Sequence, residues 1–319
     1  MKKTLLLVVI ISLFWAGSEV GAEEIQVAVA IPPLETFVEE VGGEEVKNVV
    51  MIPPGRSPAN YAPSPRELAA FSDSVIYFSL GLPAEEANIL PEAREINSDL
   101  EIVRLEEQVA EVYDPLYLVD RGSDSAGSSI EKEHSTGEES GKQEEGHEHS
   151  GGEDPHTWLS PRRAELMVEI IASELGKIDK ENRDKYLDNA KKYIEEIRET
   201  DMKIRGMLKE LEGSKFIIFH PSFGYFADEY GLEMVALEDE GKEASPGHLQ
   251  DIIDLVREEN IKTVFYQQEI DSRQTEALAG EVGADIEKLT PLASDYLDNL
   301  LRTAELLQEA SGVDSDGND

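Results

Sequence analysis

The stretch KFIIFHPSFGYFADEYGLEMVAL, residues 215–237, contains a strand, a helix and a second strand in direct succession. The apolar run at 215–220 predicts a buried strand, and the helix begins at Ser222 after a proline. A second apolar run at 232–237 predicts another strand. Short strands joined by a helix are typical of neighbouring parallel strands, so this stretch predicts an α/β fold.

The same alternation continues on both sides of this stretch. Helices are predicted at 246–259, 273–283 and 294–310, and a strand at 262–268. The segment 284–289 lies between the last two helices and continues the alternation. Nearer the beginning of the chain, the pattern predicts strands at 25–31, 46–52, 75–80 and 101–105, with helices at 34–43 and 65–71. We therefore expect two α/β lobes, each with a mainly parallel sheet.

A helical region separates the two blocks. Its apolar side chains recur at intervals of three, four or seven residues: Tyr186, Ala190, Tyr193, Ile197, Ile204, Leu208 and Leu211. This spacing predicts one apolar stripe along a helix of ~40 Å, at ~1.5 Å per residue. Such a long rigid helix can link the two lobes.

The predicted domains follow from these patterns. The N-terminal lobe covers 23–160, the helical region with the interlobe helix 161–213, and the C-terminal lobe 214–311, with a disordered tail at 312–319. Within the first lobe, residues 119–153 are acidic, rich in glycine and serine, and contain histidines. Their apolar surface is too small to offset the entropy of ordering them, so we predict a disordered loop there.

The first residues, MKKTLLLVVIISLFWAGSEVGA (1–22), have the pattern of a secretory signal peptide. Two lysines precede an apolar run, and small residues precede the expected cleavage after Ala22. The alternative, a retained anchor, is disfavoured because the apolar run has about 12 residues and a membrane span needs about 20. We expect a mature protein in the periplasm or another extracytoplasmic space, without membrane insertion.

Composition narrows the classes of partner. The chain has no cysteine, which excludes disulfides, thiolate metal sites and a lipidated cysteine. With 68 acidic and 29 basic residues, the formal net charge is −39. Nucleic acids and anionic membranes would be repelled, and cations attracted. Adaptation of the surface to high salt is an alternative explanation of this charge.

Two of the six histidines occupy positions suited to a binding site. His156 lies between Pro155 and Trp158, in a turn that the prolines restrict. His220 ends a predicted strand, and ligands of open α/β sheets bind at the carboxyl ends of the strands. One such histidine in each lobe favours a metal site in the cleft, because neutral imidazole is a common zinc ligand.

The other histidines are less informative. His134, His147 and His149 lie among glutamates in the predicted loop, where they could capture divalent ions weakly or simply be solvated. His248 is interpreted as a helix-surface residue without a role. No phosphate-binding loop, G-x-S-x-G elbow or H-E-x-x-H helix occurs, so we predict that the protein is not an enzyme.

Several phrases together resemble the metal-specific solute-binding proteins of bacterial and archaeal ABC transporters for zinc and manganese. The resemblance extends over nearly the whole predicted mature chain, and the phrases that carry it stand in family order: MIPPGRSPANYAPSPREL (51–68), DPHTWLSP (154–161), FHPSFGYFADEYGL (219–232), EGKEASPGHL (240–249) and LTPLASDYLDNL (289–300). The resemblance implies a two-lobe clamp that holds a metal between the lobes. It puts His156 and His220 at two of the family's ligand positions.

Two departures from the family pattern affect the expected ligands. Ala59 stands where the family phrase normally has a histidine, and Thr290 stands where an aspartate often precedes Pro-Leu. Two imidazoles leave a tetrahedral zinc half-coordinated. We name Glu269 as the first candidate for a further ligand and Asn60 as a poorer one, with water or a loop histidine for the remainder. Manganese, which favours oxygen ligands, stays open as the ion.

The leading hypothesis is an extracytoplasmic, monomeric solute-binding protein that captures a divalent metal ion, zinc first, and delivers it to an ABC permease. The alternative is a degenerate family member that lacks tight metal binding and serves as a binding module for another solute or surface partner. A third hypothesis is an enzyme with a catalytic zinc, since two histidines and a carboxylate with open positions also describe such a site.

Overall fold

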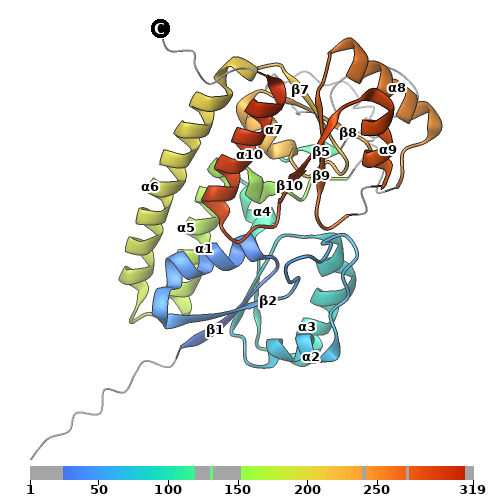
Figure 1. Cartoon of the computed structure of the whole chain (residues 1–319). Helices are drawn as coiled ribbons and strands as arrows, with labels where there is room; N and C mark the ends of the chain where they lie inside the picture. The colour runs from blue at the N-terminus through green and yellow to red at the C-terminus, as the bar shows by residue number, and fades with distance from the viewer. Residues whose placement is uncertain (1–23, 119–129, 132–151, 239–241, 271–272, 313–319) are drawn as a thin grey trace, which may run out of the picture.

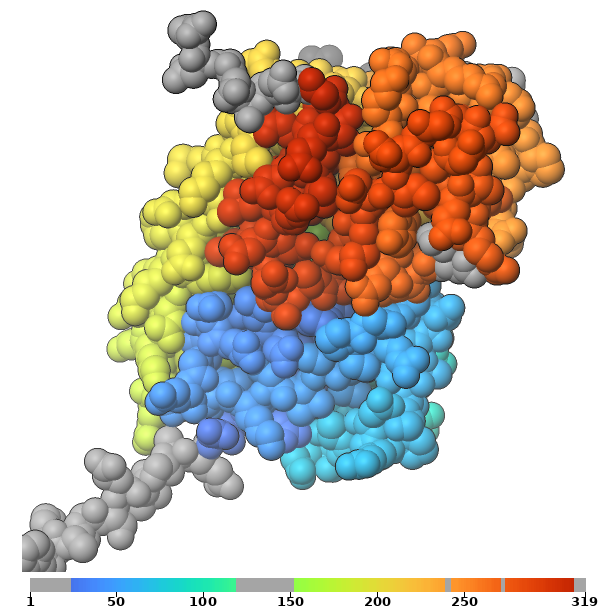
Figure 2. All heavy atoms as spheres, in the orientation of Figure 1, coloured from blue at the N-terminus to red at the C-terminus, as the bar shows by residue number. Residues whose placement is uncertain are grey.

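The computed structural model of the chain describes residues 24–118, 130–131, 152–238, 242–270 and 273–312. Two sheets of four parallel strands are stacked end to end, and helices cover them (Figure 1). The predicted fold class, two α/β lobes with mainly parallel sheets and a long linking helix, is confirmed. The space-filling view shows the two lobes in contact (Figure 2).

The N-terminal sheet has the order β2-β1-β3-β4. Its strands are β1 (Ile25–Val29), β2 (Val46–Val50), β3 (Ile76–Ser79) and β4 (Glu101–Arg104). Helices α1 (Pro32–Gly42), α2 (Pro65–Leu68), α3 (Leu90–Ile96) and α4 (Leu105–Ala110) connect or follow them, with single helical turns at Gly43–Glu45, Ala69–Ser72 and Glu85–Ile89. The sequence pattern predicted the four strands but missed α3 and α4, whose short apolar stripes are interrupted by charged residues.

The C-terminal sheet has the order β10-β9-β7-β8. Its strands are β7 (Lys215–Ile218), β8 (Glu233–Ala236), β9 (Thr263–Gln267) and β10 (Asp285–Leu289). The helices of this lobe are α7 (Gly224–Tyr230), α8 (Pro246–Glu258), α9 (Arg273–Val282) and α10 (Tyr296–Ser311). Helix α7 ends at Gly231, whose φ of 69° is a left-handed conformation that glycine adopts without strain.

The predicted helical region consists of two antiparallel helices, α5 (Pro161–Ile178) and α6 (Arg183–Leu208), followed by a turn at Lys209–Leu211. The chain reverses at Asp179, whose carboxylate accepts hydrogen bonds from the Asn182 side chain at 2.7 Å and from the Tyr186 hydroxyl at 2.8 Å. Helix α6, with 26 residues, is the long helix that the apolar stripe predicted. It runs beside both sheets (Figure 1).

One apolar core extends from the N-terminal sheet through α5 and α6 into α7 and α10. Phe37 of α1 packs edge-on against Tyr296 of α10, with ring centroids 4.7 Å apart, and lies 6.1 Å from Tyr193 of α6. A second core lies within the C-terminal lobe, between its sheet and helices α8 and α9. Because the larger core crosses from lobe to lobe, the lobes share packing beyond the linking helix.

A third, antiparallel pair of short strands, β5 (Tyr117–Leu118) and β6 (Ile130–Glu131), was not predicted. Strand β6 falls within the segment 119–153 that was predicted to be disordered. Glu153 also bridges to Tyr117. The remainder of that segment up to residue 151 lies outside the described residues. The same is true of residues 1–23, which include the predicted signal peptide at 1–22, and of residues 313–319 of the predicted tail.

Candidate metal centre

His156 is held in place by its own turn. The Asp154 carboxylate lies 2.7 Å from His156 Nδ1 and also accepts a hydrogen bond from the His156 backbone N–H at 2.9 Å. The side chain of Asp154 is fully buried. Two residues later, the Trp158 indole N–H donates to the carbonyl of Pro291 at 2.8 Å, and the Tyr296 hydroxyl donates to the carbonyl of Trp158 at 2.7 Å. The imidazole therefore projects from a turn that both lobes hold.

His220 lies just beyond β7, at the carboxyl end of the C-terminal sheet, as predicted. Its Nδ1 is 2.6 Å from Glu238 Oε1, and Glu238 follows the neighbouring strand β8. Gln267, the last residue of β9, donates from Nε2 to the His220 carbonyl at 2.5 Å and to the Ser222 hydroxyl at 2.8 Å. Side chains from the ends of three adjacent strands thus fix the position of His220.

The fold brings the two imidazoles together, with ring centroids 5.2 Å apart and ring planes 73° from parallel. In each ring a carboxylate accepts from Nδ1, so Nε2 is the nitrogen left free to bind a ligand. This arrangement of carboxylate and histidine is the usual one behind zinc-binding imidazoles, because it fixes the tautomer and makes the ligand more basic. The pair therefore has the donor chemistry of a zinc site.

The third predicted ligand, Glu269, lies two residues beyond β9 and is partly buried. Burial raises the pKa of its carboxyl above the ordinary value, although Lys288 opposes the shift, and Oε2 has no hydrogen-bond partner. Across the described ranges, no three His, Cys, Asp or Glu side chains converge on one point in a way that could hold a metal. The structure brings the histidines together without Glu269, whose role stays a prediction.

The two positions that depart from the family phrase, Ala59 and Thr290, make local contacts. Ala59 is exposed, and its backbone N–H donates to the Ser57 hydroxyl at 3.3 Å. Thr290 faces α10, where its hydroxyl donates to Asn299 Oδ1 at 2.6 Å while Asn299 Nδ2 donates to the Thr290 carbonyl at 2.8 Å. Asn60, the poorer candidate, is exposed.

The remaining histidines add little to this site. His248 lies near the beginning of α8, with Nε2 3.2 Å from the carbonyl of Ala236. The histidines at 134, 147 and 149 lie outside the described residues, and so does the acidic segment 239–241 directly after Glu238.

Sequence analysis missed the residues that orient the imidazoles. Asp154 stands two residues before His156, a spacing that allows a side-chain contact with the backbone N–H of the histidine. Glu238 follows a strand that the sequence pattern identified, and the carboxyl ends of parallel neighbours share one edge of the sheet. The position of Glu238 just after a predicted strand could have identified it as a candidate. Only the strand order, with β8 beside β7, shows that Glu238 lies next to His220.

Comparison with known proteins gives a consistent result. Residues 27–310 match the family model described as ZnuA, zinc-uptake complex component A periplasmic. The high-affinity zinc uptake system protein ZnuA of Bacillus subtilis (strain 168) is 35% identical over 141 residues, 44% of each chain. The zinc-binding protein AdcA of Streptococcus pyogenes serotype M6 is 26% identical over 299 residues, 91% of this chain and 56% of that protein. The matches thus span about half the length of these curated relatives.

The similar solved structures are matched over nearly their whole length, unlike the curated relatives. A crystal structure of ZnuA has a TM-score of 0.77 and 31% identity, covering 90% of this chain and 99% of that one. A zinc-bound ZnuA that lacks residues 138–173 of its own sequence has a TM-score of 0.76, also with 31% identity, and covers 90% and 98% of the two chains.

Proposed function

The chain belongs to the family of periplasmic component A proteins of zinc-uptake complexes, and on this premise we propose that it captures a zinc ion between its lobes and delivers it to an ABC permease. The names of its relatives, a zinc uptake protein and a zinc-binding protein, support this proposal over a degenerate binding module. The family is named for uptake, and we expect no enzymatic activity.

The observation that carries the proposal is the pair His156 and His220, with ring centroids 5.2 Å apart and each Nδ1 beside a carboxylate. Zinc is the cargo, and two neutral imidazoles would supply half of its tetrahedral shell. We propose Glu269 as a further ligand, with water or a loop histidine completing the shell. Manganese is the second candidate ion, disfavoured because it prefers more oxygen ligands.

We place this protein in an extracytoplasmic space, as a monomer that docks on a membrane permease. The signal-like pattern of residues 1–22 and the periplasmic designation of the family support this location. Among the described helices, none is both long and apolar enough to cross a membrane.

A second candidate function is a binding module for another solute or a surface partner. It is favoured by exposed Ala59, by Thr290 bonded to Asn299, and by the lack of a three-residue metal cluster within the described ranges. In such a protein, zinc would leave the stability of the fold unchanged.

Thermal unfolding of the metal-stripped protein from Glu23 onward distinguishes the two candidates. Zinc at a hundred times its dissociation constant should add about 2.7 kcal/mol of stability. We expect the midpoint to rise by several degrees with zinc, and the rise to disappear in the double variant His156→Ala with His220→Ala. A midpoint that responds to neither zinc nor manganese would contradict the proposal.

A further inference from the structure

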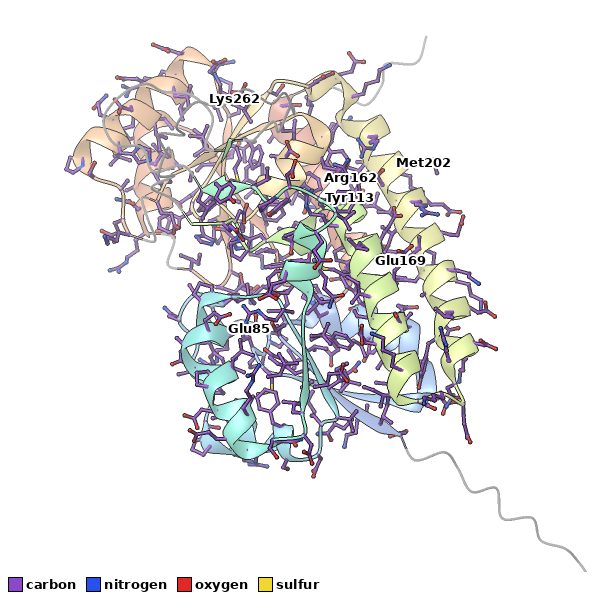
Figure 3. The ribbon with its side chains drawn as sticks, turned by 180° about the vertical axis from the view of Figure 1, so that it is seen from behind. Glu85, Tyr113, Arg162, Glu169, Met202 and Lys262 are labelled. Atoms are coloured by element: carbon purple, nitrogen blue, oxygen red, sulfur yellow. The ribbon has the colours of Figure 1, made fainter. Side chains whose placement is uncertain are left out.

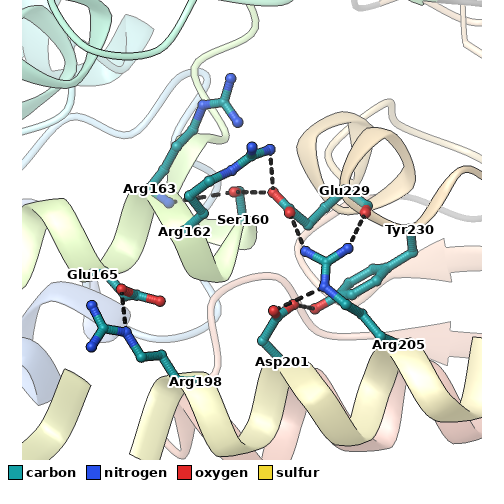
Figure 4. A network of polar contacts seen from close by, with 9 residues as sticks. All are labelled: Ser160, Arg162, Arg163, Glu165, Arg198, Asp201, Arg205, Glu229 and Tyr230. Atoms are coloured by element: carbon teal, nitrogen blue, oxygen red, sulfur yellow. Dashed lines mark hydrogen bonds and ion pairs between the residues drawn. The ribbon is translucent and has the colours of Figure 1, made fainter. Parts of the chain in front are cut away.

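A buried ionic network connects the two segments that carry His156 and His220. Its centre is Glu229 of α7, whose side chain is only 2% exposed (Figure 4). Glu229 Oε2 accepts a hydrogen bond from the Ser160 hydroxyl at 2.9 Å and lies 2.9 Å from Arg162 Nη2, and Oε1 pairs with Arg205. One carboxylate therefore joins α5, α6 and α7.

The contact with Ser160 fixes the turn of His156. Ser160 caps α5, its hydroxyl accepting from the Arg163 backbone N–H at 3.4 Å, and it directly follows the helical turn Thr157–Leu159 that His156 begins. Because Ser160 is fully buried, its hydroxyl needs a partner within the protein. Glu229 is that partner, and it thereby holds the end of the His156 turn against α7.

A second residue of α7 reaches the same region. Tyr225 lies four positions before Glu229, on the same face of the helix. Its ring packs 4.4 Å from the Arg163 guanidinium, and its hydroxyl accepts from the Leu116 backbone N–H at 3.0 Å. Arg162, adjacent in the chain, packs 5.4 Å from the ring of Tyr113, and Figure 3 shows these two residues side by side. Helix α7 thus contacts the chain on both sides of the His156 turn.

The other end of α7 leads directly to His220. The Ser222 backbone N–H donates to the His220 carbonyl at 2.8 Å, and Gln267 bonds to both residues. At its far end, α7 is tied to α6, since Arg205 donates to the Glu229 carbonyl at 3.1 Å and the Tyr230 hydroxyl donates to Asp201 at 3.0 Å. Hydrogen bonds and directly connected chain therefore link His156 to His220 through Ser160, Glu229 and α7.

Glu229 is suited to a permanent contact because it stays ionised. Burial by itself raises the pKa of its carboxyl, but Arg162, Arg205 and Ser160 more than compensate and lower the pKa below its ordinary value. A buried carboxylate with three such partners is costly to separate from them.

We propose that Glu229 is a positioning residue that joins the His156 turn to α7, so that His156 and His220 move as one rigid pair. This inference rests on the proposed function and adds to it. Movement of the remaining N-terminal lobe would therefore leave the spacing of the two imidazoles unchanged. The loop around Ala59 is outside this network and is held separately, with Ala84 N–H donating to the Pro58 carbonyl at 2.9 Å.

The test uses two variants that weaken the network by different routes. Glu229→Gln keeps the shape of the side chain and removes its charge. Ser160→Gly removes one hydroxyl and retains most of the preference for the helix cap. The matched control is Glu165→Gln, which breaks another contact between α5 and α6, Arg198 Nε to Glu165 Oε2 at 2.9 Å, without involving α7 (Figure 4).

Two measurements are made on each variant and on the wild type. The zinc dissociation constant is obtained by competition with a chromophoric chelator. Amide hydrogen exchange is followed in metal-free protein at Leu159 and Ser160, whose N–H groups bond to the carbonyls of His156 and Thr157 at 3.2 Å. We expect both network variants to bind zinc about tenfold more weakly, as for residues that orient metal ligands. Exchange at these two amides should accelerate by about tenfold through local opening.

The outcomes separate this inference from the proposed function. If the wild type binds no zinc, the proposed function is wrong, and the exchange rates still decide whether Glu229 holds the His156 turn. Unchanged exchange in both network variants overturns the inference. Faster exchange with wild-type zinc affinity also overturns it, because Glu229 would then stabilise the turn without positioning the histidines. If the control Glu165→Gln changed zinc affinity and amide exchange as much as the network variants do, the inference would also be overturned.

Discussion

Glu238 and His220 lie at the carboxyl ends of the neighbouring parallel strands β8 and β7, with Glu238 Oε1 2.6 Å from His220 Nδ1. The contact joins a buried carboxylate, 7% exposed, to an imidazole that remains partly accessible, 22% exposed. It orients the ring and leaves Nε2 free to bind a ligand, as the contact between Asp154 and His156 does for the other imidazole.

Removing the charge of Glu238 should weaken zinc binding without preventing it. In Glu238→Gln, the side-chain oxygen can still accept from Nδ1, but the neutral amide makes the imidazole less basic. We expect zinc affinity to fall by about 10-fold to 100-fold. Competition titration with a chelator measures this. Glu233→Gln, which changes a carboxylate 41% exposed at the beginning of β8, serves as the control, and an equal loss in both variants would contradict the role of Glu238.

Replacing Glu269 tests the third ligand. If Glu269 binds zinc, Glu269→Ala should lower the affinity by at least about tenfold, since a carboxylate completes what two imidazoles leave open. The control is Glu276→Ala, an exposed carboxylate on α9 of the same lobe. Isothermal titration of zinc into both variants distinguishes them. Matching affinities would remove Glu269 from the ligand set and shift the search to other oxygen donors.

Ala59→His should strengthen zinc binding, because it restores an imidazole at the position where the family phrase normally has one. Ala59 is exposed and its loop is held by Ser57 and Pro58, so the new side chain has room. We expect a gain in affinity of about tenfold or more. Asn60→His, one position further, should have little effect. A gain at residue 60 with none at residue 59 would show that the loop presents a different residue to the cleft.

Glu106 gives the stability of the protein a specific pH dependence. Burial raises the pKa of this carboxyl from 4.5 to about 7, with backbone bonding and Arg104 opposing the shift. Because the pKa is raised by folding, the folded state binds the proton more tightly. The stability that Glu106 contributes is complete below pH 4.5 and is lost as the pH rises through 7.

Glu106→Gln should therefore raise the free energy of unfolding at pH 8, by at most about 3 kcal/mol, and should change it little at pH 4. Urea unfolding at both pH values measures the difference. The control is Glu107→Gln. The side chain of Glu107 is 67% exposed, so this substitution should give no comparable gain. An equal effect of Glu106→Gln at the two pH values would show that the substitution acts through packing and not through the charge.

Much of this structure was predictable from local sequence. The apolar runs identified seven of the eight strands of the two parallel sheets, and the alternation of elements singled out the segment 284–289 that contains β10. The apolar stripe from Tyr186 to Leu211 identified α6. The division of the helical region into α5 and α6 was not predicted, because the reversal depends on side-chain bonds of Asp179 that no periodicity reveals. The same holds for β5 and β6, which are each two residues long.

The sequence by itself determined where His156 and His220 stand, one in a turn restricted by prolines and one at the end of a strand. Strand and helix patterns arise from interactions within a few residues, and these can be followed along the chain. Only the tertiary structure decided that the two rings lie 5.2 Å apart, that Asp154 and Glu238 orient them, and that Glu229 joins their segments. These contacts depend on the order of the strands and the packing of α7 against α5 and α6, which couple residues far apart in the chain.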